Sequence, residues 1–502
     1  MNLLRRNPEL LRHVRSELRA PRMALAAGLS YVLCFLISIL HSQMTTAGPY
    51  SGRTPESNSV FFWILIPQAL VLSLWCLSST TQSIAGERLL KTYDFLRTTR
   101  LTAGELLVGM VFGVPIMAYF AVGCTVPFAI AAGLGSQVPL SAMLVTYFLL
   151  FVFVVFLSLV GLLVSMLVQK PRAGGALLIV WFWLMPFTLI GMTGRFGFPY
   201  PGVAALTIVP GLLPLYHAYT SVPSTAPFFG VHVPLLSLSL LLYVSLGAWI
   251  VVALLRNLKR EREEIQLLSR WQAIGLAAYL NLLMLGFLDP AALLGTRSPY
   301  SFGVEPATIV HLAFNNLIFY AVGLATLTPP ERLKIWFRDY HAGRQSYLSE
   351  NGPPWPWMAL AAALAFVALW LEAASARSAV PFDNWSLGHS GLSLMVFLVY
   401  ATRDVLFLQW CTLTKMKNPI VKGILLVWLY YFAAGVITTP LAQASRSMAS
   451  SGFCLLTPAG ALVHGQIETA LIGAGLQIGV IIYLLFLIRD RLTRAPAQLA
   501  TA

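Results

Sequence analysis

Long apolar stretches recur along the entire chain, and they constrain its fold more than any other feature. Twelve stretches of roughly 20 residues are each long enough to cross the hydrocarbon core of a bilayer, about 30 Å thick, as a helix. They lie near residues 23–41, 60–81, 105–133, 139–168, 173–193, 231–255, 272–289, 305–327, 357–376, 388–410, 420–443 and 467–488. Only 10% of the residues are charged, against about 25% in an average soluble domain. We therefore predict an all-α, polytopic membrane protein with about 12 transmembrane helices.

The basic residues are concentrated in every second loop between these stretches. If the N-terminus lies inside, 27 of the 33 lysines and arginines fall in inner segments, whose net charge is then +15, so that the whole excess of +14 lies inside. This is the distribution that the positive-inside rule requires. We predict a cell membrane of the bacterial inner-membrane type, with both termini cytoplasmic. The lipid bilayer then explains the basic excess, and nucleic acid is excluded as a partner.

Similar sequence landmarks return at nearly one interval. Glu87-Arg88-Leu89, after the second stretch, matches Glu331-Arg332-Leu333, after the eighth, 244 residues later. A Gly-to-Trp string opens both the fifth and the eleventh stretch, with an offset of 247–248 residues. A common interval indicates a duplication, and an even number of spans gives both copies the same orientation. We predict two parallel six-helix repeats, a first module at 1–256 and a divergent second module at 257–502, with 256–271 as a charged joint.

The N-terminal segment 8–20 has the pattern of an amphipathic helix. Arginines fall on one of its faces. The other face carries Leu10, Leu11, Val14 and Leu18. Such a helix lies in the plane of a membrane surface with its apolar face toward the lipid. We predict that this helix lies on the inner surface, ahead of the first transmembrane helix.

The segment 86–109, between the second and third stretches, carries the most informative residues. Its charged side chains recur three or four residues apart, so that Glu87 can pair with Lys91, and Asp94 with Arg97, on a helix. A threonine followed three residues later by a glutamate then has the pattern of a capping box. We predict a short, ordered helix presented to the cytosol. The alternative is a solvated charged loop that only fixes the topology.

This segment resembles the coupling-helix region of ATP-binding-cassette transporter permeases of the type-2 exporter class. That class has a Glu-Arg pair, then Thr, an acidic residue, Leu, a Thr-Pro-Leu-Ser-like turn, Glu and Gly-Lys. The matching residues are Glu87-Arg88, Thr92, Asp94, Leu96, Thr99, Leu101-Thr102, Glu105 and Gly109. The chain departs from the pattern at Arg100, where Pro is usual, and at Met110, where Lys is usual. The resemblance covers 1–256 directly and 257–502 through the repeat.

The resemblance implies a transmembrane permease subunit of an ATP-driven exporter. In that class two six-span modules form the translocation path, and short cytoplasmic helices sit in grooves on soluble ATPase subunits. The coupling residues would be Glu87, Arg88, Thr92, Asp94, Leu96, Arg97 and Thr99. The sequence has no G-x-x-x-x-G-K-[ST] phosphate loop, so we expect no enzyme activity from this chain alone. A separate ATPase subunit, in two copies, would bind ATP and Mg, and no cofactor is expected here.

The second module is unequal to the first in the corresponding segment, 328–356. It keeps the Glu331-Arg332-Leu333 landmark but lacks the Thr-x-Asp-x-Leu sequence. In its place stand Trp336, Phe337, Arg338 and Tyr340. Aromatic residues and arginine are common anchors at interfaces, so a weaker second coupling site would consist of Glu331, Arg332, Trp336 and Arg338. The alternatives are a segment that docks no ATPase, or a surface helix with aromatic side chains among lipid headgroups.

Four polar residues fall inside predicted spans. His311 and Asn315 are four residues apart and share one helical face. That placement predicts hydrogen bonding between helices, with a proton relay as the alternative. For Arg403 and Asp404 we expect Arg403 to snorkel to the inner surface while Asp404 bonds locally. The alternative is pairing across the interface between the two modules.

Glycines and cysteines inside the spans have packing explanations. Gly109 and Gly113 form a G-x-x-x-G pattern in the third stretch, which lets another helix approach closely. The five cysteines are scattered and show no ligand spacing, so that neither a disulfide framework nor a metal site is expected. Catalytic motifs are not evident either.

Two other functions stay open on the sequence. A secondary transporter driven by an ion gradient would need buried ion or proton carriers near the membrane midplane, and only the eighth and tenth stretches offer candidates. A non-transporting membrane subunit that scaffolds a larger complex is compatible with the unequal second module. The transported substrate is not determined, because one architecture serves many cargoes.

Overall fold

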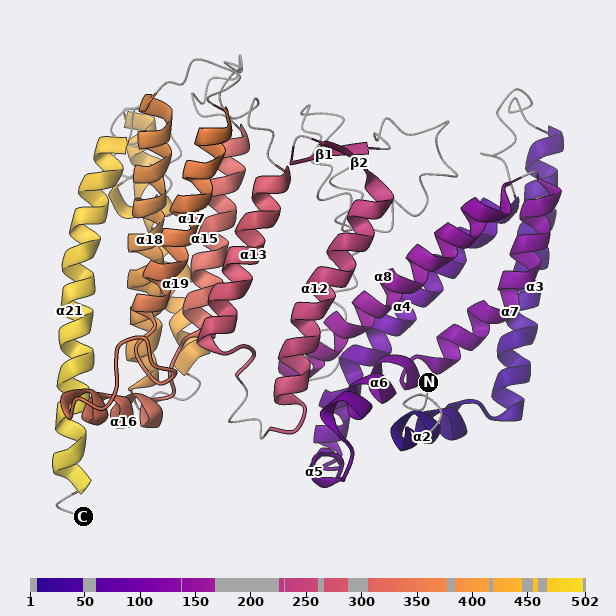
Figure 1. The fold of residues 1–502 in the computed structure, drawn as a ribbon, viewed down its shortest axis with the longest axis horizontal. Coiled ribbons are helices and arrows are strands. Elements are labelled where there is room, and N and C mark those ends of the chain that lie inside the picture. The colour runs from indigo at the N-terminus through magenta and orange to yellow at the C-terminus, as the bar shows by residue number, and fades with distance from the viewer. Residues whose placement is uncertain are drawn as a thin grey trace. The chain divides into compact units, whose positions relative to one another are not determined.

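The computed structural model of the protein describes residues 7–47, 60–136, 138–167, 225–229, 231–260, 266–287, 306–376, 384–414, 419–444, 455–458 and 467–499. Within these residues the fold is all-α, with 85% of them in helices (Figure 1). The only described strands are β1 (Thr225–Phe228) and β2 (Val231–Pro234), which pair in a two-stranded sheet.

Contacts divide the chain into two compact units. Unit 1 contains Met1–Pro227 and Val231–Leu267, and unit 2 contains Phe228–Gly230 and Leu268–Ala502. The main division therefore falls after Leu267, inside the charged joint predicted at 256–271. Whether each unit is a permease module stays a prediction.

Unit 1 combines long helices with three short ones. Its helices are α2 (Pro8–Glu17), α3 (Ala20–Ala47), α4 (Val60–Leu89), α5 (Tyr93–Thr98), α6 (Ala103–Gly113), α7 (Ile116–Gly135), α8 (Leu140–Leu167) and α12 (Leu235–Asn257). In Figure 1 the short helices α2, α5 and α6 gather at one end of this unit. Buried side chains of α3, α4, α7 and α8 form one core, and a second core lies where α5 and α6 meet the ends of α4, α8 and α12.

Unit 2 is built in a similar way from seven helices in its described residues. They are α13 (Arg270–Phe287), α15 (Pro306–Ala325), α16 (Pro330–His341), α17 (Trp355–Ala376), α18 (Asn384–Thr412), α19 (Pro419–Ala444) and α21 (Ile467–Leu499). Its largest core joins α13, α15, α17, α18 and α21. A smaller core packs the short helix α16 against α18 and the C-terminal half of α21 (Figure 1).

Every predicted apolar stretch except the fifth overlaps a helix, and the fifth, 173–193, lies outside the described residues. In the described parts of the chain, seven helices are long and apolar enough to cross a membrane. They are Ala20–His41, Val60–Leu89, Ile116–Gly135, Leu140–Leu167, Leu235–Asn257, Gly391–Thr412 and Ile467–Thr493. The protein is thus a multi-pass membrane protein by the character of its helices. The count of twelve and the two repeats stay predictions.

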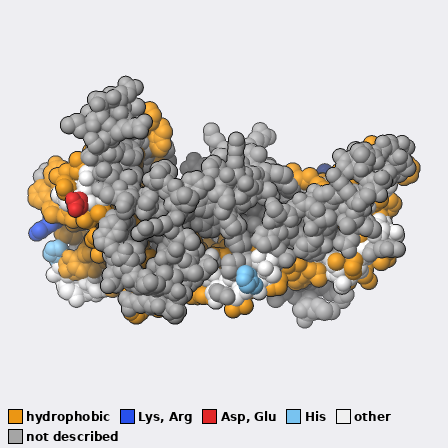
Figure 2. Space-filling view, turned by 90° about the horizontal axis from the view of Figure 1, so that it is seen from above, with side chains coloured by type: hydrophobic (Ala, Val, Ile, Leu, Met, Phe, Trp, Pro, Cys, Tyr) orange, Lys and Arg blue, Asp and Glu red, His pale blue; other side chains and the backbone are white. Residues whose placement is uncertain are grey.

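The outward faces of these long helices are apolar. Phe35 of α3 and Phe486 of α21 are both 64% exposed, a degree of exposure that water would penalise and lipid would not. In the face shown in Figure 2, most of the coloured side chains are hydrophobic and few are charged. These helices therefore present hydrocarbon to their surroundings.

Proline sets two helix boundaries that the sequence prediction missed. The third stretch was predicted as one span at 105–133, but α6 ends at Gly113 and α7 begins at Ile116, with Pro115 between them. The sixth stretch begins as strand β2, and α12 starts only after Pro234. Proline has no N–H to donate and fits the first turn of a helix better than its interior, so each helix begins directly after it.

Candidate functional site

The connection between α4 and α6, residues 86–105, contains the predicted short helix, α5. Lys91 turns the chain after α4 with a φ of 58°, a left-handed conformation that is uncommon outside glycine. Thr92 closes this turn, because its backbone N–H donates to the Glu87 carbonyl over 2.9 Å. Its hydroxyl also donates to the Glu87 carboxylate. The direction of α5 is therefore fixed by the last turn of α4.

The capping box predicted at the start of the third stretch is confirmed. The Thr102 hydroxyl accepts a hydrogen bond from the Glu105 N–H over 3.2 Å, and the Glu105 carboxylate accepts one from the Thr102 N–H over 2.8 Å. These bonds satisfy N–H groups that the first turn of a helix leaves unpaired. As a result α6 starts at a defined residue, four positions after Thr99, the C-cap of α5.

One face of α5 is anchored in the body of unit 1. Tyr93 and Leu96 are each only 4% exposed and pack in the core formed with α6, α8 and α12. The Tyr93 hydroxyl donates to the Leu258 carbonyl over 2.7 Å at the end of α12. Burial raises the pKa of Tyr93, which keeps this hydroxyl protonated as a donor. The guanidinium of Arg88 lies over the Tyr93 ring and donates to the Met166 carbonyl at the end of α8.

The opposite face of the connection is exposed. The Asp94 side chain is 79% exposed and lies 3.6 Å from Arg97, the ion pair that the spacing predicted. The predicted partner of Glu87 is different, because its carboxylate pairs with Arg12 of α2 instead of Lys91. Large apolar side chains also reach outward here, with Phe95 73% exposed. The connection thus has one fixed face and one face available for contact.

Helix α2 begins with a cap that also ties it to α6. The Asn7 side-chain oxygen accepts hydrogen bonds from the N–H groups of Glu9 and Leu10, and Pro8 occupies the first turn. The Asn7 amide donates to the Glu105 carbonyl over 2.6 Å. The predicted amphipathic helix is therefore present, and it ends at Glu17. The sequence prediction overlooked Asn7, although Asn followed by Pro is a recognisable helix start.

The Gly109–Gly113 pattern is the surface on which α2 packs. A Cβ added at Gly109 would lie 2.7 Å from Glu9 Cβ, and one added at Gly113 would lie 3.0 Å from His13 Cδ2. Side chains larger than hydrogen would thus push α2 away from α6. The α2 side chains that lie against these glycines are the polar Glu9 and His13, while Leu11 on the apolar face is 38% exposed.

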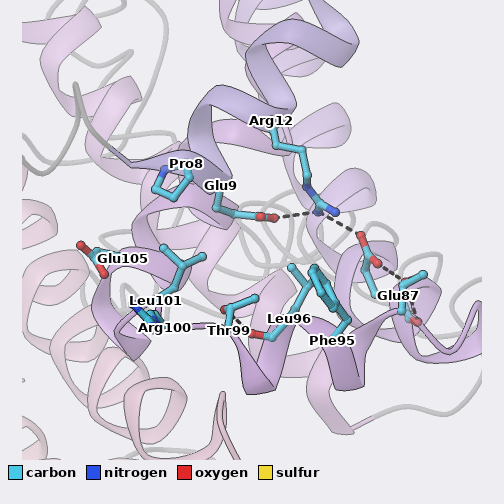
Figure 3. Close-up of a pocket in the computed structure, with 11 residues that line it drawn as sticks. Pro8, Glu9, Arg12, Glu87, Phe95, Leu96, Thr99, Arg100, Leu101 and Glu105 are labelled. Carbon is cyan, nitrogen blue, oxygen red and sulfur yellow. Dashed lines mark hydrogen bonds and ion pairs between the residues drawn. The ribbon is translucent and has the colours of Figure 1, made fainter.

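A charge cluster links α2 to the end of α4. Arg12 Nη2 lies 2.7 Å from Glu9 Oε1 and 3.0 Å from Glu87 Oε1, so that one guanidinium joins two carboxylates (Figure 3). His13 Nε2 lies 3.2 Å from the same Glu9 oxygen. Burial raises the pKa of Glu9, but His13 and Arg12 together lower it by more, and the net pKa lies below its ordinary value of 4.5. Glu9 is therefore a buried carboxylate stabilised in its ionised form.

These elements enclose a pocket of about 710 Å³ (Figure 3). It is lined by side chains of α2, the end of α4, α5 and the start of α6. They are Pro8, Glu9, Arg12, Glu87, Thr92, Phe95, Leu96, Thr99, Arg100, Leu101 and Glu105. Four of the seven predicted coupling residues line this pocket, namely Glu87, Thr92, Leu96 and Thr99. Of the other three, Arg88 lies over the buried Tyr93 ring, and Asp94 and Arg97 pair with each other.

The corresponding segment of unit 2 turns its aromatic residues inward. Trp336 of α16 is only 5% exposed, stacks on Tyr340 and donates its indole N–H to the Ser346 carbonyl over 3.0 Å. Trp336 is therefore not accessible as a partner anchor, because its ring is part of the unit 2 core. Glu331 and Arg338 are exposed, and Arg332 is half-buried.

Arg270, which the sequence prediction did not single out, holds this segment in place. It is 2% exposed at the first turn of α13. Its guanidinium donates to the carbonyls of Thr326, Ser349 and Gly352 over 3.0, 3.0 and 2.6 Å. The chain before α16 and the chain after it are thus bound to one side chain.

Arg403 and Asp404 form a buried ion pair inside unit 2. Arg403 is 6% exposed and Asp404 is 2% exposed, with 2.5 Å between Arg403 Nη2 and Asp404 Oδ1. The expectation that Arg403 snorkels to the surface is wrong, because its side chain is buried against Asp404, whereas the expected local bonding of Asp404 is confirmed. The alternative of a pair across the two modules is also wrong, since both residues belong to α18.

Neighbouring helices of unit 2 complete this network. The second Asp404 oxygen accepts hydrogen bonds from the Tyr320 and Tyr431 hydroxyls over 2.6 and 2.8 Å. Arg403 Nη1 donates to Gln477 over 2.8 Å, and its guanidinium lies 4.4 Å from the centre of the Tyr430 ring. The network therefore joins α15, α18, α19 and α21.

Of the two remaining polar residues predicted in the spans, Asn315 is fully buried in α15. The His311 side chain lies outside the described residues, although its backbone belongs to α15. The hydrogen-bonding and proton-relay interpretations of this pair therefore both stay predictions.

The α2–α4–α5–α6 region offers ion pairs, hydrogen bonds and exposed apolar side chains. Such a set is suited to contact with another macromolecule. Across the described residues, no three His, Cys, Asp or Glu side chains come together as metal ligands. Comparisons with protein-family models, with curated proteins and with solved structures found no match for this chain.

Proposed function

We propose that this chain is the transmembrane permease subunit of an ATP-driven exporter of the ATP-binding-cassette type. The α4–α6 connection would couple it to a separate ATPase subunit. The observation that carries the proposal is α5, a short helix between two apolar stretches with one face fixed and one face exposed. Tyr93 and Leu96 provide the fixed face, and Asp94 and Phe95 belong to the exposed one.

Coupling requires that a push on α5 reaches the membrane helices. The Tyr93 hydroxyl joins α5 to α12, and Thr92 joins α5 to α4 through Glu87. The Thr102 capping box sets the start of α6 shortly after α5 ends. Arg12 extends these links to α2. A displacement of α5 would therefore be passed to several helices together, as a ligand-biased switch needs.

Helix packing supports the proposed pair of six-helix modules. In unit 1, α3 packs on α4 and α7, and α8 packs on α4, α7 and α12. In unit 2, α13 packs on α15 and α17, and α18 packs on α15, α17 and α21. The partners correspond in chain order, with α5 and α16 between the second and third long helices of their units. Two modules of this kind in one chain would supply the whole translocation path.

The remaining parts of the proposal follow from the sequence. The chain has no phosphate loop, so ATP and Mg would bind to the ATPase partner, in two copies. The excess of Lys and Arg in alternate loops supports a cytoplasmic location for α2, α5 and both termini, in a bacterial-type inner membrane. On this account the chain transports and does not catalyse.

The test is to purify the tagged chain from its native membrane in mild detergent and to measure Mg-dependent ATP hydrolysis in the preparation. We expect hydrolysis to copurify with the wild-type chain and to fall about tenfold in a Glu87→Ala/Asp94→Ala double variant, which is about 1.4 kcal/mol of lost contact. Glu17→Ala is the matched control, because Glu17 is an acid of α2 that pairs with Arg22, outside the α4–α6 connection. Wild-type preparations without ATP hydrolysis would contradict the proposal.

The ion-driven transporter is the main alternative, and Asp404 is the residue that such a mechanism would require. Both of its carboxylate oxygens are engaged, one by Arg403 and the other by Tyr320 and Tyr431. An ion or proton that bound to Asp404 would have to displace these partners. We therefore favour the ATP-driven exporter. If ATP hydrolysis copurifies with the chain but no transport accompanies it, the chain would be a non-transporting scaffold.

A further inference from the structure

We infer that the chain docks its ATPase through unit 1 alone, by an apolar ridge of Leu89, Leu90 and Phe95. The partner surface that fits this ridge is an apolar groove with an acidic rim. The inference rests on the proposed function and specifies which part of the chain meets the ATPase. Unit 2, by contrast, keeps its corresponding segment folded onto its own core.

The apolar ridge is unusual in its location. Leu89, Leu90 and Phe95 are 69%, 72% and 73% exposed, among the most exposed large apolar side chains in the described residues. Most other strongly exposed apolar side chains lie on long apolar helices, where lipid can cover them. The ridge instead lies among charged residues at the end of α4 and on α5, outside the apolar stretches. An apolar patch with a polar rim in such a place marks a protein interaction site.

The charges around the ridge specify the partner further. Lys91 and Arg100 are exposed in the same α4–α6 connection, and Arg100 lines one pocket with Phe95. Lys259 is also exposed, and its ammonium donates to the Thr99 carbonyl of this connection over 3.4 Å. The acid on the exposed face of α5, Asp94, is already paired with Arg97. The rim is therefore basic, and charges across a stable interface are arranged to be complementary. An acidic rim around the partner's groove follows.

The unit 2 segment lacks such a ridge. Leu333 and Trp336, the buried residues of α16, face the core at 1% and 5% exposure, and Arg270 binds the chain on both sides of the helix. Its most exposed apolar residues, Ile335 and Leu348, are 47% and 43% exposed and belong to different elements. Docking that used Trp336 as an anchor would require its ring to leave the core. Only one subunit of an ATPase pair would therefore contact this chain.

The experiment compares apolar-to-acidic substitutions in the two units. Leu90→Asp and Phe95→Asp place a negative charge against the proposed acidic rim, and Ile335→Asp and Leu348→Asp are the matched unit 2 controls. All four side chains are exposed, so that folding should be unaffected. Each tagged full-length chain is purified from its native membrane, and the amount of ATPase polypeptide per chain is measured together with its thermal unfolding midpoint.

We expect the ATPase content to fall at least about tenfold in each unit 1 variant, which corresponds to a loss of about 1.4 kcal/mol or more of binding free energy. In both unit 2 variants it should stay at the wild-type level. We also expect ATPase retention to decrease as salt is raised, because a basic rim is screened. Loss of the ATPase from a unit 2 variant overturns the inference while leaving the proposed function intact, and so does full retention in both unit 1 variants. If no ATPase copurifies with the wild-type chain, the proposed function itself is overturned.

Discussion

The Glu9 side chain lies directly on Gly109, so close that a methyl group at position 109 would sit 2.7 Å from both Glu9 Cβ and Glu9 Cγ. Glu9 is only 3% exposed there, although it is ionised. A buried carboxylate is tolerated because Arg12 neutralises it and His13 Nε2 lies 3.2 Å from the same oxygen. The register of α2 on α6 is therefore fixed by both shape and charge.

Substitution of Gly109 by Ala is expected to loosen α2. The added Cβ collides with two Glu9 atoms and the helix must shift, at a cost of about 1–3 kcal/mol as in overpacked cores. Hydrogen exchange of the 8–17 backbone should become faster. Gly104→Ala is the control in the same helix, because a Cβ at Gly104 meets nothing within 4 Å. Equal exchange in the two variants would show that close approach at Gly109 is unimportant.

Arg12→Ala should uncouple α2 from α4. The change leaves Glu87 without its ion pair to α2 and Glu9 with only His13 beside it. Because the Arg12 side chain is 44% exposed, we expect a cost of about 1 kcal/mol instead of the 3–5 kcal/mol of a fully buried pair. Hydrogen exchange should increase both in α2 and around Thr92, whereas exchange unchanged from wild type around Thr92 would contradict the bridge. Arg15→Ala, an exposed arginine of the same helix, is the control.

The packing of α2 is expected to weaken in acid. The pKa of Glu9 is lower in the folded protein than its ordinary value of 4.5, so the stabilisation from ionised Glu9 is complete above pH 4.5 and is lost as pH falls through the lower folded-state pKa. Hydrogen exchange of α2, corrected for the intrinsic pH effect, should therefore rise below pH 4.5 in the wild-type chain. In Glu9→Gln this rise should disappear, and its persistence would assign the effect to another group.

Neighbouring residues of α5 should separate stability from docking. Leu96 is 4% exposed in the core, so Leu96→Ala is expected to cost about 2–5 kcal/mol of unfolding free energy. Phe95 is 73% exposed, so Phe95→Ala should leave the thermal unfolding midpoint unchanged while lowering ATPase content. The two measurements are made on the same preparations. A large loss of stability in Phe95→Ala would mean that this ring packs on its own chain.

Asp404→Asn should be among the most destabilising single changes in unit 2. It leaves the buried Arg403 charge uncompensated, at a cost of about 3–5 kcal/mol. Thermal unfolding in detergent would record this loss, with Glu468→Gln, an exposed acid of α21, as the control. The double variant Arg403→Met/Asp404→Leu removes both charges and should recover most of the loss. A double variant as unstable as the single one would mean that the surrounding tyrosines need the pair.

Local sequence patterns predicted local structure well. The Thr102–Glu105 capping box and the Asp94–Arg97 pair each depend on residues three positions apart, so that a helix alone brings them together. The helical positions of the apolar stretches also follow from periodicity and length. Two helix boundaries, at Pro115 and Pro234, were not predicted. The sequence alone does not tell whether a proline ends a helix or lies within one.

Contacts between residues far apart in the chain could not be predicted from the sequence. Arg12 and Glu87 are 75 positions apart, and Glu87 had a nearer candidate partner in Lys91. Gly109 and Gly113 were recognisable as a close-packing pattern, but the pattern does not name the helix that packs there. Trp336 likewise gave no sign of facing inward, since a surface helix and an interface helix share the same amphipathic spacing.

The adjacency of Arg403 and Asp404 in the chain has a consequence for biogenesis. A lone charge entering the bilayer on a nascent helix is costly, but here the compensating charge is the next residue to be synthesised. The pair can close within α18 before Tyr431 and Gln477 have left the ribosome, so that the helix is delivered to the lipid electrically neutral. Separating the two residues by a single inserted alanine should thus impair membrane integration at the translocon.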